Sequence, residues 1–213
     1  MSHVATLLLG LASLPSVLQG NRTGALLAPH VTLVLNMEAD VPNEIVSAMK
    51  NEFVRIYAAT PYQFQWRSAE SVQEGESFDD LAVVRMTGTC AADPLPLYDE
   101  RGPLGLTHVT NGSVLPFVSL ECDRLRKTLQ SYLEGKNASA WQPIFGRALG
   151  RVLAHEMYHV LAHTAKHGKT GVTRGALSAH ELAAPDLRMD AESLRLIEIA
   201  RVGSASQSSS MGF

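Results

Sequence analysis

The pattern of hydrophobic and polar residues predicts a chain that begins with strands and ends with helices. In the first half, three short segments have the composition of strands and are bounded by turn residues. They are His30–Asn36, Tyr62–Trp66 and Leu81–Met86. Between the first two, apolar residues recur with helical spacing, which predicts a helix from Pro42 or Asn43 to about Ala59.

Two further apolar runs, Leu104–Val109 and Val114–Leu120, flank the dipeptide Asn111-Gly112. Asn-Gly between two such runs is a strong signal for a tight β-hairpin. Proline cannot donate a hydrogen bond to a sheet, so Pro116 predicts that its strand lies at an edge. The first half is therefore expected to form a sheet with an edge hairpin.

The second half has the apolar spacing of helices. A short helix is expected from Asp123 to about Leu133, and Gln142-Pro143 is expected to open a long, largely apolar one. A last amphipathic helix would begin at Asp190 or Ala191. We expect the Ser-rich residues 204–213 to be disordered.

A short helix is also expected at Ala179–Ala184, with Ser178 as its cap. Glu181 stands three residues after Ser178, which is the spacing of a capping box. The order strand, helix, further strands with a hairpin, then long helix indicates an α+β domain over residues 28–203. Its mixed sheet would pack on the long helix, and 213 residues with 46% hydrophobic content can bury one such core.

The long helix contains the sequence His155-Glu156-Met157-Tyr158-His159, an HExxH motif. Each helical residue turns about 100° from the last, so His155 and His159 lie one turn apart on one face and can reach one ion. Glu156 falls about 60° from their midpoint, close enough to reach a water on the metal without being forced to ligate it. The motif therefore predicts Zn²⁺ on the two histidines, with Glu156 as general base.

A catalytic zinc site takes a third protein ligand and leaves the fourth position to water. His167 lies eight residues after His159, just before two glycines, where the helix can end and the chain can fold back. It is the favoured third ligand. His163 lies about 12 Å of helical rise from His155, so we expect it to line the cleft instead. A carboxylate from a following helix, Glu181 or Glu192, is the remaining alternative.

This run of residues resembles the zincin metallopeptidases, and in particular bacterial secreted zincin-like proteins with a third histidine eight residues after the second. The matching positions are Gly150–His159, His167 and Gly171-Val172. The resemblance implies zinc on His155, His159 and His167, with Glu156 as base. It also implies that one arm of the edge hairpin pairs with an extended peptide substrate.

The chain departs from the metzincin pattern within that resemblance. Metzincins have a third histidine six residues after the second and a glycine three residues after it, where this chain has Ala165 and Ala162. Met189 is the only candidate for the methionine turn of that family.

Composition and charge restrict the partners. The formal charge is −3 and there is no basic run, which excludes the usual footprint for nucleic acid or an anionic membrane. The apolar stretch near the N-terminus is too short to span a membrane and has the length of a signal-peptide core, so residues 1–20 are read as a signal peptide, with a buried strand or helix as the alternative. We expect a monomer that acts on a peptide or protein.

The chain has two cysteines, Cys90 and Cys122, and neither belongs to a CxxC motif. Together with the N-terminal segment they favour one disulfide in a secreted or periplasmic protein, although two buried thiols would give the same sequence.

Two zinc-dependent functions remain open from the sequence, besides the third possibility that the helix is merely rich in histidine and binds no metal. The first is a zinc metallopeptidase that hydrolyses peptide bonds with Glu156 as base. The second is a non-catalytic, zinc-stabilised binding module, against which the presence of Glu156 argues, because a structural site has no use for that carboxylate.

Overall fold

The computed structural model describes residues 28–38, 40–91 and 102–210. Its centre is a five-stranded sheet with strand order β2-β1-β3-β5-β4. The strands are β1 (His30–Met37), β2 (Gln63–Ser68), β3 (Leu81–Thr87), β4 (Gly105–Thr110) and β5 (Ser113–Glu121). The signal peptide expected at residues 1–20 lies outside the described residues.

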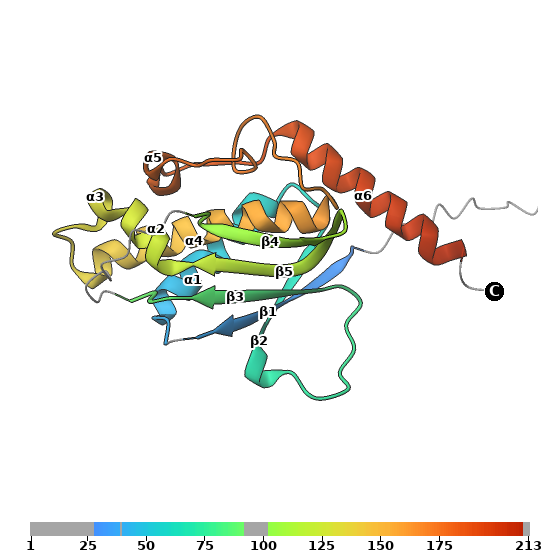
Figure 1. Ribbon diagram of the computed structural model, residues 1–213, viewed down its shortest axis with the longest axis horizontal. Coiled ribbons are helices and arrows are strands. Elements are labelled where there is room, and N and C mark those ends of the chain that lie inside the picture. The colour runs from blue at the N-terminus through green and yellow to red at the C-terminus, as the bar shows by residue number, and fades with distance from the viewer. Residues whose placement is uncertain (1–27, 39, 92–101, 211–213) are drawn as a thin grey trace, which may run out of the picture.

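Helices α1 (Asn43–Tyr57) and α4 (Ala138–Leu161) lie along one face of the sheet, and their apolar sides form the core with it (Figure 1). The remaining helical segments are η1 (Ala69–Ser71), α2 (Cys122–Thr128), α3 (Gln130–Leu133), α5 (Ala179–Ala183) and α6 (Ala191–Ser210). This arrangement confirms the α+β fold expected from the sequence.

The sheet is mixed. β1 pairs in parallel with β2 and β3, and β3 pairs in parallel with β5. β4 is antiparallel to β5 and lies at the edge. Asn111 (φ 51°) and Gly112 (φ 79°) form the turn between them, with the two positive φ angles that a tight hairpin turn requires. The edge hairpin predicted from Asn-Gly is therefore present.

The prediction that Pro116 marks an edge strand is wrong, because β5 lies between β3 and β4. Pairing of β5 with β3 begins one residue later, at Phe117 opposite Val83. On the other side, the register with β4 shifts between Thr107 and Val109, where an irregularity interrupts the ladder. Pro116 thus occupies a local break in pairing, which is the other environment that tolerates proline in a sheet.

Helix α4 packs closely on α1 because two of its glycines face the α1 backbone. A Cβ at Gly146 would lie 2.5 Å from the Ile45 carbonyl oxygen, and one at Gly150 would lie 2.5 Å from that of Met49. The Tyr57 hydroxyl also donates a hydrogen bond of 2.9 Å to the carbonyl of Ala154, directly before the HExxH motif. These contacts fix the position of the motif relative to α1.

The start of α4 differs from the prediction by more than one turn. Asn137 is the cap, and its side chain accepts a hydrogen bond of 3.1 Å from the Ala140 N–H. Pro143 lies inside the helix instead of at its start. An Asn cap satisfies a free N–H at the helix start, and this local bond outweighed the preference of proline for the first turn.

The C-terminal helix α6 is longer than predicted and includes residues 204–210, which were expected to be disordered. Ser204 and Ser206 donate hydrogen bonds to the carbonyls of Ala200 and Val202, one turn earlier. A helix that is already anchored by its first turns adds further residues at little cost, so a serine-rich composition does not end it.

Cys90 and Cys122 form a disulfide with Cα atoms 5.1 Å apart, which joins the chain after β3 to the start of α2. The predicted disulfide is therefore present, and it is consistent with an extracellular location. Within the described part of the chain, no helix has both the length and the apolar character needed to cross a membrane.

Candidate metal centre

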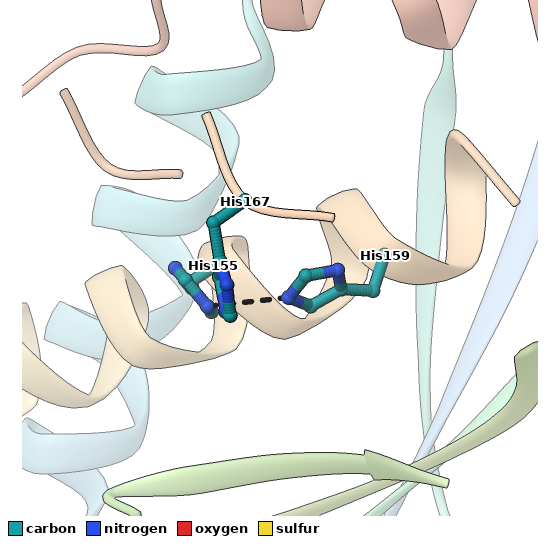
Figure 2. A group of neighbouring side chains, drawn as sticks. All are labelled: His155, His159 and His167. Atoms are coloured by element: carbon teal, nitrogen blue, oxygen red, sulfur yellow. Dashed lines mark hydrogen bonds between the residues drawn. The ribbon is translucent and has the colours of Figure 1, made fainter. Parts of the chain in front are cut away.

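His155 and His159 project from the same side of α4, as their spacing predicts (Figure 2). His155 Nδ1 lies 2.9 Å from the carbonyl oxygen of Val172, and His159 Nδ1 lies 2.8 Å from that of Thr164. A carbonyl oxygen can only accept, so each Nδ1 carries the hydrogen and each neutral ring presents a bare Nε2. The backbone after the helix thus selects the tautomer that a metal needs.

The two Nε2 atoms lie 3.3 Å apart. In the neutral rings each Nε2 carries a lone pair, so this short distance between them is favourable only when a cation lies between the two atoms. Nitrogens about 2.0–2.1 Å from one tetrahedral zinc ion would lie about 3.3–3.4 Å apart. The donor set and its spacing therefore fit zinc.

His167 lies in the segment after α4, and Figure 2 shows its ring turned toward the other two. Its ring centre is 5.1 Å from that of His155 and 4.9 Å from that of His159. One ligand atom from each of the three histidines lies within 4.8 Å of the others. The structure brings together the three histidines proposed as ligands.

The alternative ligands lie elsewhere. Glu181 is engaged in the predicted capping box, where its Oε2 accepts hydrogen bonds from the N–H and hydroxyl of Ser178. Glu192 is paired with Arg195 at 2.7 Å. Neither belongs to the histidine cluster.

His163 does not line the cleft, contrary to the prediction. It follows the end of α4 with φ 47°, a turn of the backbone that ends the helical run. Its side chain instead lines a different cavity, together with Tyr62 and Asp80. The helical projection failed here because the residue is no longer helical.

The segment that carries His167 is hydrogen-bonded to the residues just before α6 and to its first turn. The Val172 N–H donates to the Arg188 carbonyl, and Gly171 forms a β-bridge with Met189. The hydroxyls of Thr173 and Ser193 lie 2.7 Å apart in the core. Val172 also supplies the acceptor for His155, so this fastening holds the ring of a proposed ligand in place. Met189 is buried beside this bridge.

Glu156 points to the sheet side of the histidine cluster and is buried. Thr107 of β4 places its Oγ1 2.7 Å from Glu156 Oε2 and 3.0 Å from the Glu156 carbonyl oxygen. Gly105, two residues earlier on the same face, leaves room for the carboxylate, because a Cβ there would lie 2.8 Å from Glu156 Oε1. The edge strand and the helix thus enclose the carboxylate between them.

Burial is the main influence on the acid–base properties of these groups. It raises the pKa of Glu156 above its ordinary value, although the hydrogen bond from Thr107 and the nearby imidazole of His159 oppose that rise. Burial also lowers the pKa values of His155 and His159, with their backbone hydrogen bonds acting in the opposite direction. Burial therefore favours the neutral form of both rings, which is the form that binds a metal.

A cleft of about 580 Å³ lies over the histidines and Glu156. One wall is β4 with the residues before it, and the other is the segment 174–177. Most of the lining is apolar, including Leu104, Leu106 and Leu177. A ligand in this cleft could therefore contact both walls and the histidine cluster.

Comparison with known proteins gives a fold and no family. The sequence matches no protein-family model and no curated protein. Among solved structures, it is similar to archaemetzincin from Methanopyrus kandleri, with a TM-score of 0.52 and 11% identity. The similarity covers 84% of this chain and 99% of that one. The fold is zincin-like.

Within this zincin-like fold, three residues of the site were not predicted from the sequence. Thr107 and Gly105 reach the site from β4, and Arg174 reaches it from the opposite wall. The alternation of β4 placed Gly105 and Thr107 on one face, but nothing in the sequence says that this face meets Glu156. Arg174 lies in a Gly/Thr-rich loop without periodicity, so no signal pointed to it.

Proposed function

We propose that this chain is a zinc-dependent metallopeptidase, with zinc held by His155, His159 and His167. The observation that carries the proposal is the convergence of three imidazoles and a buried carboxylate at the floor of one cleft. Three ligands leave one coordination position for water, as in catalytic zinc sites. The zincin-like fold supports the same chemistry by analogy only, because a fold does not define an activity.

Zinc, when bound, supplies Lewis acidity to the scissile carbonyl and makes water acidic enough to react near neutral pH. Glu156 takes a proton from the attacking water and later delivers it to the leaving amine. The buried carboxylate lies beside the histidine cluster, where it can accept this proton and return it. Thr107 holds the carboxylate in place between these two transfers.

The substrate is an extended peptide that adds to the outer edge of β4. Within the described residues β4 is paired on one side only, with β5, so its other edge offers free N–H and C=O groups. Leu106 and Val109 of this strand are exposed and line the cleft. Main-chain pairing would hold the peptide, and these side chains would contact its residues.

A non-catalytic zinc-stabilised binding module is the second candidate. One observation favours it: the Glu156 carboxylate is tied to Thr107 and to the sheet, which a purely structural role would also explain. In such a module zinc would stabilise the fold, and peptides would bind without being cleaved.

The deciding experiment measures zinc and hydrolysis in the same variants. Elemental analysis should find about one zinc per chain in the wild type, as a three-histidine site predicts, and much less in His167→Ala. The matched control is His163→Ala, because this exposed histidine lies in another cavity and should leave zinc unchanged. Glu156→Ala should keep zinc and lose peptide hydrolysis. Zinc without hydrolysis in the wild type would instead support the binding module.

We further propose that the protein acts outside the cytoplasm. The disulfide between Cys90 and Cys122 persists in oxidising compartments and would be reduced by cytoplasmic thiols. Mass analysis of the mature protein from its native host would test both the cleavage of an N-terminal segment and the disulfide.

A further inference from the structure

Arg174 stands on the wall of the cleft that faces β4. Its Nε donates a hydrogen bond of 2.8 Å to the carbonyl of Ala176, and its Nη2 lies 2.5 Å from Glu181 Oε2. Glu181 is itself fixed by the capping box of α5. The guanidinium is therefore oriented by two acceptors, although 44% of the side chain remains exposed.

The third nitrogen of this guanidinium, Nη1, has no hydrogen-bond partner among the residues that the structure describes. A guanidinium that is held along one edge can still donate hydrogen bonds to a carboxylate from its remaining N–H groups. Because the orientation is already set by Ala176 and Glu181, binding there costs little additional side-chain entropy.

The charge of the cleft makes this donor distinctive. Of the described residues that line it, Glu156 and Arg174 carry formal charges apart from the histidine cluster, and the rest are apolar or small. A positively charged group on an otherwise apolar wall attracts a negative group and repels a positive one.

We propose that Arg174 is a specificity-determining residue that binds a carboxylate of the peptide substrate. The inference rests on the peptidase proposed above and adds the substrate class, a peptide with an acidic group close to the bond that is cleaved. The carboxylate comes either from an Asp or Glu side chain or from a free C-terminus. Both sources present the same planar acceptor to the guanidinium.

Two peptide series separate these sources. In the first, a single Glu replaces Gln at each position in turn. In the second, a free C-terminal carboxylate is compared with its amide. Binding is measured on the zinc-loaded Glu156→Gln variant, and hydrolysis on the protein with Glu156 intact. Binding and cleavage are therefore read independently.

We expect one member of these series to bind and react about tenfold or more better than its neutral partner, as for a charge-assisted hydrogen bond. Arg174→Gln should remove that preference and change the neutral peptide little. Arg174→Lys should retain part of it, because the charge remains and the planar fork is lost. Arg188→Gln is the matched control, since this exposed arginine pairs with Asp186 and does not line the cleft, and it should preserve the preference.

Several outcomes would overturn the inference. The wild type could bind acidic and neutral peptides equally, or Arg174→Gln could weaken both classes to the same extent, which would indicate a structural role. An Arg188→Gln variant that loses the preference as fully as Arg174→Gln would indicate a general effect of positive charge and no specific role for Arg174.

The same measurements distinguish failure of the proposed peptidase activity from failure of the role of Arg174. An acidic preference in binding that depends on Arg174, without cleavage of any peptide, would keep the recognition role and reject the peptidase. Cleavage of peptides with no acidic preference would keep the peptidase and reject the role of Arg174.

Discussion

Thr107 Oγ1 lies 2.7 Å from Glu156 Oε2, which joins the edge strand of the sheet to the proposed catalytic helix. The hydroxyl has a single hydrogen, and the Glu156 carbonyl at 3.0 Å is the competing acceptor. The shorter distance favours the carboxylate. The strand that would receive the substrate is thereby connected to the group that would move the proton.

Replacing Thr107 by Val should lower kcat about tenfold with zinc retained, because the carboxylate loses the donor that orients it. Valine keeps the shape of threonine, so packing changes little. Thr107→Ser restores the hydroxyl and should recover most of the activity. Steady-state kinetics with zinc analysis checks this. Equal losses in the Val and Ser variants would mean that the methyl group matters and the hydrogen bond does not.

Gly105→Ala should destabilise the protein by about 1–3 kcal/mol, because its Cβ would be forced into a filled space. The added carbon would lie 2.7 Å from Val152 Cγ1 and 2.8 Å from Glu156 Cγ. Gly203→Ala is the control, since a Cβ at this helical position meets nothing within 4 Å and alanine favours the helix. Urea denaturation of both variants measures the difference. Equal stability would show that β4 can move away from α4 at no cost.

Glu52 makes stability depend on pH. Burial opposes its ionisation, but hydrogen bonds from Arg55 and Arg151 outweigh this and lower the pKa of Glu52 below its ordinary value of 4.5. A carboxyl group with a lowered folded-state pKa stabilises the fold above its unfolded-state pKa. The contribution is lost as the pH falls through the folded value. We therefore expect part of the stability to disappear below about pH 4.5, in urea denaturation as a function of pH.

Glu52→Gln tests the same pair at neutral pH. Arg151 is fully buried, so loss of the partner at 2.6 Å should cost about 3–5 kcal/mol. The stability of the Glu52→Gln variant should also depend less on pH below 4.5 than that of the wild type. Glu74→Gln, on an exposed loop residue, should change neither quantity. A Glu52→Gln variant as stable as the wild type would show that water or a shifted side chain replaces the carboxylate.

Zinc should raise the thermal unfolding temperature, because a ligand that binds only the folded state stabilises it. An excess of about a hundredfold over Kd corresponds to about 2.7 kcal/mol, or about 5 °C or more for a chain of this size. His167→Ala should lose most of this rise, and His163→Ala should keep it. Differential scanning fluorimetry with and without a chelator measures it. An equal rise in His167→Ala would remove that residue from the ligand set.

Local patterns predicted most of the fold. The three early strands, the Asn-Gly hairpin and helix α1 depend on neighbouring residues, and all are present. The prediction from Pro116 was wrong because a proline inside a sheet is tolerated at a break in strand pairing. The prediction from Pro143 was wrong because the Asn137 cap starts the helix earlier, which leaves the proline inside it. The end of α6 was not predicted, because composition alone does not show that the preceding turns already form a helix.

For the site, the sequence by itself determined that His155 and His159 share one face and that Glu156 lies beside them, since helical geometry relates residues three and four apart. It also favoured His167 as their partner. The tertiary structure decided everything that depends on contacts between distant segments. The carbonyls of Thr164 and Val172 select the histidine tautomers, Thr107 holds Glu156, and Arg174 faces β4 across the cleft. Such contacts arise from packing and chain reversal, which no local periodicity encodes.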